Sequence, residues 1–282
     1  MSAMTDDRIQ RAVSADGTEI AGRAHGLGPP LVLVHGGPHD GDLAWEPMLP
    51  HLTDRFTCYL PSIRGRGLSA DNPDHSPPRL QEDLDAFVDS IDGPVFVASW
   101  SAGGPWALGT AAHTASVTAV AIYEPTVGAV MREDVRARRS ATAEQMAAAV
   151  SDGRLADAAR VFHALLGTDD EMAALDADYF ERCAGIVPAM LQAVQQGAAH
   201  EGPQPAAPEL LAKVTVPVLL LRGRETRLNT FYVDTEQYVA QHVADPHVRE
   251  PLPGLGHWAP LVEPEPIAEE LISFFDSLPQ PA

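Results

Sequence analysis

The sequence predicts an α/β fold with a mostly parallel, eight-stranded sheet that is flanked by helices and carries a helical lid. Three observations in the 282 residues support this prediction. Strand-like and helix-like segments alternate as far as residue 123, which is typical of a doubly wound sheet with right-handed crossovers. The alternation then stops for about eighty Ala-rich residues, and it resumes at residue 216. We therefore expect a core in two parts, 1–128 and 208–282, around a lid at 129–207.

The strands are predicted from apolar runs and turn signals. Asp16-Gly17 is a strong hairpin signal and joins the strands expected at 9–14 and 18–24. The run 31–34 is continuously apolar, as in a strand that is buried on both faces of a parallel sheet. Further strands are expected at 56–60, 95–98, 117–123, 216–221 and 247–250, and helices at 42–52, 78–91, 102–112, 230–243 and 264–278.

Helical periodicity is the main signal in the segment 129–207. Residues 155–166 place Leu155, Phe162 and Leu166 on one apolar helix face, and a second pattern runs from Met172 to Tyr179. An all-helical block inserted into an α/β alternation is typical of a lid over the carboxyl ends of the strands. No fixed-period repetition favours a separate helical repeat.

The charge balance excludes several classes of partner. The chain has 19 Lys and Arg against 39 Asp and Glu, a net charge of −20. Such a surface repels nucleic acids and anionic membranes, so we expect neither as a partner. Residues 1–10 contain no apolar run typical of a secretory signal, and no stretch is long enough to span a membrane. We therefore expect a cytoplasmic monomer or homodimer that acts on a small molecule.

The two cysteines, Cys58 and Cys183, stand far apart in the sequence and form no metal-ligand spacing with each other or with a histidine. We expect them to be buried free thiols. His242 and His247 have no third ligand at a spacing that suits a metal. The sequence therefore predicts no metal site.

The segment 95–104 carries the strongest chemical signal. An apolar strand runs into Ser99-Trp100-Ser101-Ala102-Gly103 and then into a helix, the context of a nucleophile elbow. Small residues are needed two before and two after the nucleophile, because the strand and helix backbones approach closely there. Gly103 meets this need, and Ser99 stands where glycine is more common. Ser101 is therefore the candidate nucleophile, and the amide of Ala102 at the helix N-terminus is a candidate oxyanion donor.

Two further glycine-rich turns complete the set. His35-Gly36-Gly37-Pro38 follows the strand at 31–34 and offers the Gly37 amide as a second oxyanion donor. His257 follows the last strand in a glycine-rich turn, where the general base of a Ser, acid, His chain order is expected. His35 is interpreted as structural. The candidates for substrate binding are Gly36, His39, Trp100 and Trp258.

Together these motifs resemble the α/β-hydrolase superfamily, in its cofactor-free serine type. The segment 62–69 is similar to the family's Asp-x-Arg-Gly-x-Gly-x-Ser loop, with Ser62 in place of the aspartate. The resemblance runs from the N-terminal hairpin to the last helix. It implies that Ser101 attacks an acyl carbonyl, that His257 is the base, and that neither a metal nor an organic cofactor takes part.

The acid of the triad departs from the family pattern. In most members it lies three residues past a glycine after the strand that follows the lid, and here that residue is Thr226. Glu225 is one residue early. Glu124 ends the strand after the elbow helix, where lactone hydrolases of the zearalenone-degrading type place their acid. We favour Glu124 and keep Glu225 as the alternative.

The function predicted from these residues is hydrolysis of a carboxylic ester or lactone of a small, mainly apolar substrate through an acyl-enzyme. A prolyl-aminopeptidase-like enzyme and a carbon–carbon bond hydrolase remain alternatives within the family. The alternative of another class is a non-hydrolytic lyase or cyclase, or a ligand-binding member of the fold. A serine at the elbow argues against haloalkane dehalogenases and epoxide hydrolases, which carry an aspartate there.

Overall fold

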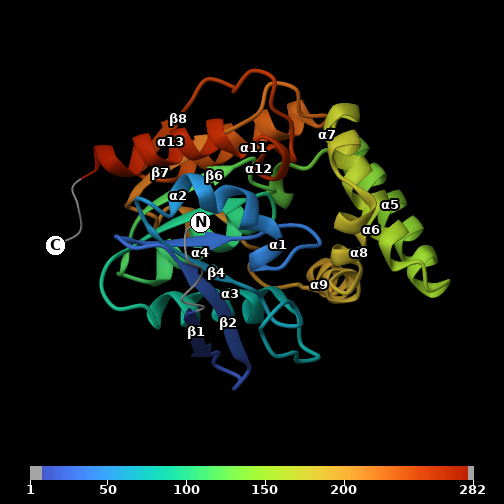
Figure 1. Cartoon of the computed structure of the whole chain (residues 1–282), viewed down its shortest axis with the longest axis horizontal. Coiled ribbons are helices and arrows are strands. Elements are labelled where there is room, and N and C mark those ends of the chain that lie inside the picture. Colours follow the sequence, from blue (N-terminus) through green and yellow to red (C-terminus); the bar gives the residue numbers. More distant parts are fainter. Residues whose placement is uncertain (1–7, 279–282) are drawn as a thin grey trace, which may run out of the picture.

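The computed structural model describes residues 8–278 and contains an eight-stranded sheet with helices on both faces (Figure 1). Most of the segment 1–10, in which no signal is predicted, lies outside the described residues. The strand order is β1-β2-β4-β3-β5-β6-β7-β8. The strands are β1 (Arg8–Val13), β2 (Glu19–His25), β3 (Pro30–Val34), β4 (Thr57–Pro61), β5 (Val95–Trp100), β6 (Val117–Tyr123), β7 (Pro217–Leu221) and β8 (Asp245–Val248).

The predicted fold class is confirmed. β1 and β2 form the expected antiparallel hairpin across Gly17, whose φ of +88° only glycine adopts without strain. β2 also pairs with β4 in antiparallel fashion, and all other strand pairs are parallel. Along β3, Leu31 and Leu33 pack into one core, and Val32 and Val34 pack into the core on the other face. This alternation explains why the whole run is apolar.

The helices around the sheet lie close to the predicted positions, with one exception. The predicted helix at 42–52 consists of three short pieces, because Pro47 and Pro50 each stand in the first turn of a new piece and cannot donate a helical hydrogen bond. The helices are α1 (Gly41–Trp45), η1 (Glu46–Met48), α2 (Leu49–Leu52), α3 (Pro77–Asp89), α4 (Gly103–His113), α10 (Pro208–Leu211), α11 (Asn229–His242), α12 (Ala259–Val262) and α13 (Pro264–Ser277).

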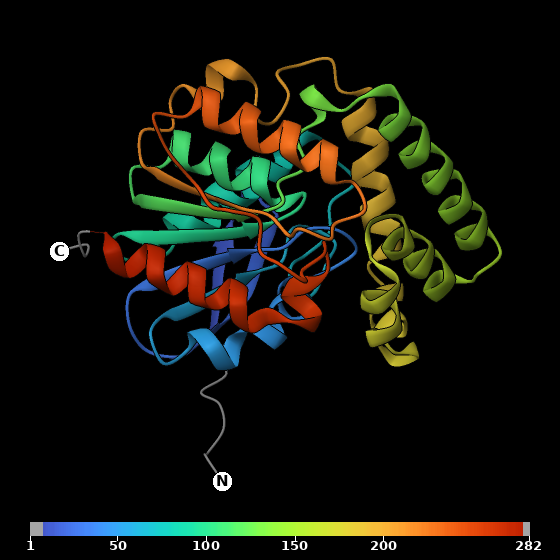
Figure 2. The same ribbon diagram turned by 90° about the horizontal axis from the view of Figure 1, so that it is seen from above.

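The chain between β6 and α10 forms helices only, and we call it the helical insertion (residues 129–207). Its helices are α5 (Glu133–Ser151), α6 (Leu155–Leu166), α7 (Asp169–Ala174), α8 (Ala177–Ala184) and α9 (Val187–Ala199), and the short η2 (Gly128–Val130) spans its first boundary. Figure 2 shows these helices as a block beside the sheet. The block has its own apolar cluster, which includes Met146, Phe180 and Met190. The predicted pattern 172–179 is divided between α7 and α8, because Asp176 caps α8 by accepting a hydrogen bond from the Tyr179 amide.

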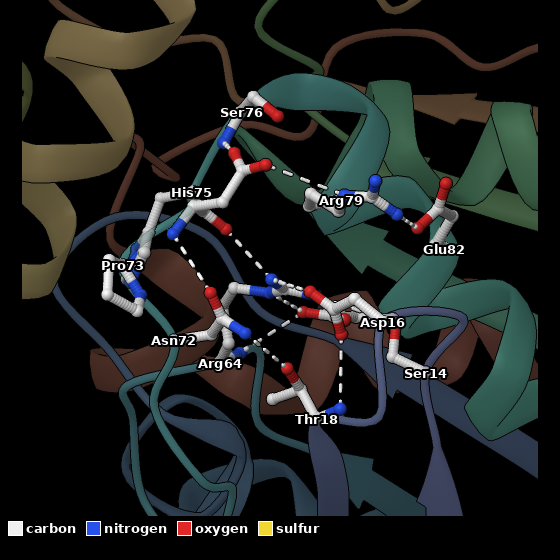
Figure 3. A network of polar contacts seen from close by, with 12 residues as sticks. Ser14, Asp16, Thr18, Arg64, Asn72, Pro73, His75, Ser76, Arg79 and Glu82 are labelled. Atoms are coloured by element: carbon white, nitrogen blue, oxygen red, sulfur yellow. Dashed lines mark hydrogen bonds and ion pairs between the residues drawn. The ribbon is translucent and has the colours of Figure 1, made fainter.

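The loop after β4 is fixed by a buried arginine (Figure 3). Arg64 donates to both carboxylate oxygens of Asp83 on α3, and to Asp16 in the β1–β2 turn. These bonds tie the N-terminal hairpin, this loop and α3 together. They keep the loop in place beside the turn that follows β3.

Cys58 and Cys183 are both free and buried, as predicted. No helix within residues 8–278 combines the length and the apolar character that crossing a membrane requires.

Candidate active site

Ser101 lies in the sharp turn between β5 and α4. Its φ of 56° is in the left-handed region, where a non-glycine residue is strained, as expected of a nucleophile elbow. A Cβ on Gly103 would lie 2.7 Å from the Val34 carbonyl oxygen, so only glycine permits the close approach of α4 to β3. The small-residue requirement deduced for position 103 is therefore met for the expected reason.

Glu124 occupies the equivalent position on the neighbouring strand. Trp100 on β5 pairs with Tyr123 on β6, so Ser101 and Glu124 are the next residues at the same edge of the sheet. Glu124 also has a left-handed backbone, with φ of 48°. Its Oε1 atom accepts a hydrogen bond of 3.0 Å from the Gly223 amide after β7. The carboxylate is 1% exposed and is thus held from two sides.

His257 joins these two residues. Its Nδ1 atom lies 2.7 Å from Oε2 of Glu124, and its Nε2 atom lies 3.1 Å from Oγ of Ser101. Because a carboxylate can only accept, Nδ1 carries the proton and Nε2 is free to accept the serine proton. The structure therefore brings together the serine, histidine and glutamate that the sequence singles out, all of them buried.

The alternative acid lies elsewhere. The side chain of Glu225 is exposed, and its amide donates to the Leu255 carbonyl. Thr226, which stands at the usual position of the acid, is buried but makes no hydrogen bond through its hydroxyl. The carboxylate that hydrogen-bonds His257 thus belongs to Glu124 and not to a residue of the loop after β7.

Four groups around the His257 loop hold it in position. Trp100 donates its indole N–H to the His257 carbonyl, and Tyr123 donates its hydroxyl to the Gly256 carbonyl. The ring of Tyr232 stacks on the imidazole with centroids 5.1 Å apart. Glu171 in the helical insertion accepts a 2.7 Å bond from the Trp258 amide.

Sequence reasoning missed Glu171 and Tyr232. Thr168-x-x-Glu171 is a capping-box pattern, which could have located the start of α7. That pattern carries no sign that the second oxygen of the same carboxylate would reach the loop after β8. Burial raises the pKa of Glu171 above its usual value, while the amides of Thr168 and Trp258 act against this rise.

The proposed oxyanion donors border one cavity of about 150 Å³. Gly36, Gly37 and Ala102 line it, and a Cβ on Gly36 would lie only 2.9 Å from that of Ser101. Arg66 holds this turn from behind by donating to the Gly37 carbonyl at 2.6 Å and to the His39 carbonyl at 3.1 Å. A larger hollow of about 520 Å³, between α4 and the helical insertion, is also lined by Ala102.

The cavity is mainly apolar, as expected, but it contains two arginines that the sequence did not predict there. Leu80, Phe162 and Met190 form part of its wall, and Arg66 and Arg139 also line it. Burial lowers the pKa of Arg66 to about 10 and also lowers the pKa of Arg139. The Nε atom of Arg66 is buried without a hydrogen-bond partner. A buried cation, Arg66, and a partly buried one, Arg139, therefore border this cavity.

Three residues predicted to bind substrate are placed differently. His39, Trp100 and Trp258 are each at most 2% exposed, and none of them lines the cavity. Trp100 stacks against His39, and the indole N–H of Trp258 donates to the His163 carbonyl. The sequence predicts that these rings bind substrate, but in the structure they form part of the packing between the sheet and the helical insertion. Of the four predicted substrate-binding residues, Gly36 alone lines this cavity.

Comparison with known proteins places this site in a family. The model of the alpha/beta hydrolase family matches residues 31–270. A relative from Metapseudomonas resinovorans, 2-hydroxy-6-oxo-6-(2'-aminophenyl)hexa-2,4-dienoic acid hydrolase, is 25% identical over 94% of this chain and 90% of its own. A pimeloyl-(acyl-carrier protein) methyl ester esterase from Stenotrophomonas maltophilia is 35% identical over 41% of this chain and 42% of its own.

Solved structures agree with the fold. An alpha/beta hydrolase from Sphaerobacter thermophilus has a TM-score of 0.70 at 25% identity, covering 94% of this chain and all of the other. The esterase RhEst1 from Rhodococcus has a TM-score of 0.77 at 22% identity, covering 96% of this chain and 99% of the other. With the sheet order and the motif positions described above, the family match over most of the chain shows that this protein belongs to the alpha/beta hydrolase family.

Proposed function

We propose that the protein is a serine hydrolase that cleaves a carboxylic ester or lactone through an acyl-enzyme. The observation that carries this proposal is the hydrogen-bonded chain from Ser101 through His257 to Glu124. A hydroxyl beside a neutral imidazole, which is in turn held by a carboxylate, is the arrangement that activates serine as a nucleophile.

The reaction follows from the positions of these atoms. Oγ of Ser101 attacks the acyl carbonyl while Nε2 of His257 takes its proton. The amides of Gly37 and Ala102 stabilise the negative oxygen of the tetrahedral intermediate. His257 then gives the proton to the leaving alkoxide, and a water molecule activated by the same histidine releases the acid. Glu124 stays ionised and stabilises the imidazolium.

An ester substrate is supported by the mainly apolar cavity wall and by the methyl ester esterase among the relatives. A prolyl-aminopeptidase-like activity is less well supported. The lids of those enzymes carry acidic residues that bind a substrate amine, whereas the described lining of this cavity has two arginines and no carboxylate. Arginines favour a substrate with a negative or electron-rich group.

The same arginines favour a second candidate, hydrolysis of a carbon–carbon bond in a substrate that carries a carboxylate. The Metapseudomonas relative, which aligns along most of the chain, is a hydrolase of a dienoic acid. Arg139 on α5 lines the same cavity as Gly37 and Ala102, a position from which its guanidinium can pair with such a group. In this reading the serine, the histidine and the oxyanion amides keep their places, and only the leaving group differs.

The test of the serine mechanism combines labelling with turnover. The wild-type enzyme should react with a fluorophosphonate probe and hydrolyse p-nitrophenyl esters of short and medium acyl chains. Ser101→Ala should lose both properties and keep the thermal unfolding temperature of the wild type within a few degrees. Absence of labelling and turnover in the wild type, or full turnover by Ser101→Ala, would instead support a non-hydrolytic or ligand-binding member of the fold.

The choice of substrate class is tested with paired esters. A neutral p-nitrophenyl ester and a p-nitrophenyl monoester of a dicarboxylic acid of equal chain length are compared, alongside a dienoic-acid substrate of the carbon–carbon type. If Arg139 binds a carboxylate, Arg139→Met should raise KM for the acidic substrates by about tenfold, the cost of one lost charged hydrogen bond. Arg138→Met, at the neighbouring exposed position, is the matched control.

A further inference from the structure

A cluster of two histidines, a tyrosine and a cysteine lies between the sheet and the helical insertion, apart from the triad. His39 comes from the loop after β3, His163 from α6, and Tyr179 and Cys183 from α8. His39, His163 and Cys183 are each 0% exposed. Their ligand atoms, Nε2 or Nδ1 of the histidines and Sγ of the cysteine, lie within 4.8 Å of one another.

The hydrogen bonds of the two rings determine their tautomers. Nδ1 of His39 lies 3.2 Å from the Gly36 carbonyl oxygen, and Nδ1 of His163 lies 2.7 Å from the Ala159 carbonyl oxygen. A carbonyl oxygen only accepts, so each Nδ1 carries the proton and each Nε2 has a free lone pair. A backbone carbonyl on the far nitrogen is also the usual support of a metal-binding histidine.

The two free lone pairs face each other. The Nε2 atoms of His39 and His163 are 3.3 Å apart, and the Tyr179 hydroxyl lies 2.5 Å from the first and 3.1 Å from the second. A single hydroxyl proton can satisfy only one of them. The Tyr179 hydroxyl therefore leaves one of the two buried acceptors without its proton, which is unfavourable.

A divalent cation between the two rings would use both Nε2 lone pairs at once, because the Nδ1–H groups leave these atoms as acceptors.

The spacing suits a tetrahedral ion. Zinc–nitrogen bonds of about 2.0 to 2.1 Å at a tetrahedral angle place two nitrogens about 3.3 Å apart, the separation found here. Two imidazoles and a thiolate form a donor set that binds zinc in preference to calcium or magnesium, which favour oxygen ligands.

From this geometry we infer that His39, His163 and Cys183 bind a structural zinc ion, with the Tyr179 hydroxyl next to it as a hydrogen-bonding neighbour. Binding replaces the thiol proton of Cys183, which is released to solvent. His39, His163 and Cys183 are fully buried, as is typical of the ligands of a structural site. The ion joins α6 and α8 to the loop that carries Gly36 and Gly37, and so fixes the helical insertion against the oxyanion turn. This inference does not depend on the proposed hydrolysis.

The test measures metal directly on the full-length protein. Chelator-treated protein is incubated with zinc, passed through a desalting column and analysed by inductively coupled plasma mass spectrometry. The wild type should retain about one zinc per chain, since buried structural sites bind tightly. Cobalt titrated into the chelated wild type should give the near-ultraviolet thiolate-to-cobalt charge-transfer band and the visible bands of a tetrahedral site.

Variants locate the ion. Cys183→Ala and His163→Gln should lose bound zinc and the zinc-induced rise in unfolding temperature, whereas Cys58→Ala removes the other buried thiol and should keep both. Because the cobalt spectrum needs only the wild type, the inference can be tested even if a cluster variant misfolds. Zinc retention by Cys183→Ala equal to wild type, or a wild type with no zinc and no thiolate band, would overturn it.

Discussion

Arg64 and His257 each lie fully buried beside a buried carboxylate, but the surrounding groups leave different atoms free. Arg64 directs all its nitrogens to protein acceptors, among them both oxygens of Asp83, Oδ2 of Asp16 and the Asp74 carbonyl (Figure 3). His257 uses Nδ1 for the hydrogen bond to Glu124, and its Nε2 atom lies 3.1 Å from Oγ of Ser101. We call the hydrogen bonds of Arg64 the saturated network, because every nitrogen of the side chain has a protein acceptor. We call Ser101, His257 and Glu124 the open network, because Nε2 of His257 keeps a lone pair that can accept a proton.

Because of this difference, we expect the Arg64 network to contribute to stability and the His257 network to contribute to the reaction. Burial by itself would lower the pKa of Arg64, but the hydrogen bonds to Asp83 and Asp16 outweigh it and raise that pKa. The guanidinium is thereby fixed in its charged state and cannot exchange a proton. At His257 the free lone pair faces Ser101, which loses its proton in the proposed reaction, and Ser101 and Glu124 both have strained, left-handed backbones.

The largest expected effect comes from breaking the open network. Glu124→Gln keeps the size of the side chain but offers an amide that disfavours the productive tautomer of His257. We expect kcat to fall by up to roughly 10⁴-fold with only a small change in stability. Glu225→Gln is the matched control and should change kcat little, because its side chain is exposed. Steady-state kinetics on a p-nitrophenyl ester would contradict the assignment if both variants lost activity equally.

Most of this network could be predicted from the sequence because its parts are local or follow from strand order, although Glu225 stayed open as an alternative to Glu124. Ser101 is predicted by an apolar strand that runs into a small-residue turn, and His257 by a glycine-rich turn after the last strand. Glu124 becomes the better acid once β6 is placed beside β5, since Trp100 and Tyr123 then pair. The strand positions were predictable for the same reason, as each apolar run is bounded by its own turn residues.

The contributions of the helical insertion could not be predicted in this way. Glu171, Arg139 and His163 reach the catalytic region only through the packing of helices that are distant in sequence from the loops they contact. Periodicity shows which face of α6 is apolar but not what covers it. Likewise, the burial of His39 and Trp258 depends on that packing, and this is why both were expected in the pocket.

The saturated network gives the next largest effect, and it acts on stability. Asp83→Asn leaves the buried guanidinium of Arg64 without its main counter-charge, which should cost about 3–5 kcal/mol of unfolding free energy. The kcat of the remaining folded enzyme should stay near that of the wild type. Denaturant unfolding and activity at low temperature measure the two properties separately. Asp89→Asn, at an exposed position on the same helix, is the control and should change neither property. A loss of kcat without a loss of stability in Asp83→Asn would contradict the structural role given to the Arg64 network.

Glu171 is expected to affect both stability and kcat, because it stabilises the protein by holding the His257 loop in position. Glu171→Ala removes the acceptor of the Trp258 and Thr168 amides and should cost about 1–3 kcal/mol of stability. It should also lower kcat, by about tenfold, because His257 is the residue before Trp258. Asp170→Ala, at the exposed neighbouring position, should do neither. A change in stability with unaltered kcat would show that the His257 loop keeps its geometry without this contact.

The smallest effect is expected at the edge of the saturated network, and it depends on pH. The hydrogen bond from Arg64 is the main reason that the pKa of Asp16 is lowered below its usual value of 3.8. Since the folded state binds this proton less readily than the unfolded state, the carboxylate contributes stability above pH 3.8 and loses it as the pH falls through the lower, folded-state pKa.

Asp16→Asn should therefore destabilise the protein by about 1–2 kcal/mol at neutral pH, less than Asp83→Asn because Asp16 is partly exposed. The difference in unfolding free energy between wild type and variant should stay constant from pH 7 to about 5 and shrink below pH 4. Denaturant unfolding at a series of pH values measures it. A difference that persists unchanged down to pH 3 would mean that Asp16 acts through packing or turn geometry. The positive charge of Arg64 would then be balanced by the Asp83 carboxylate alone.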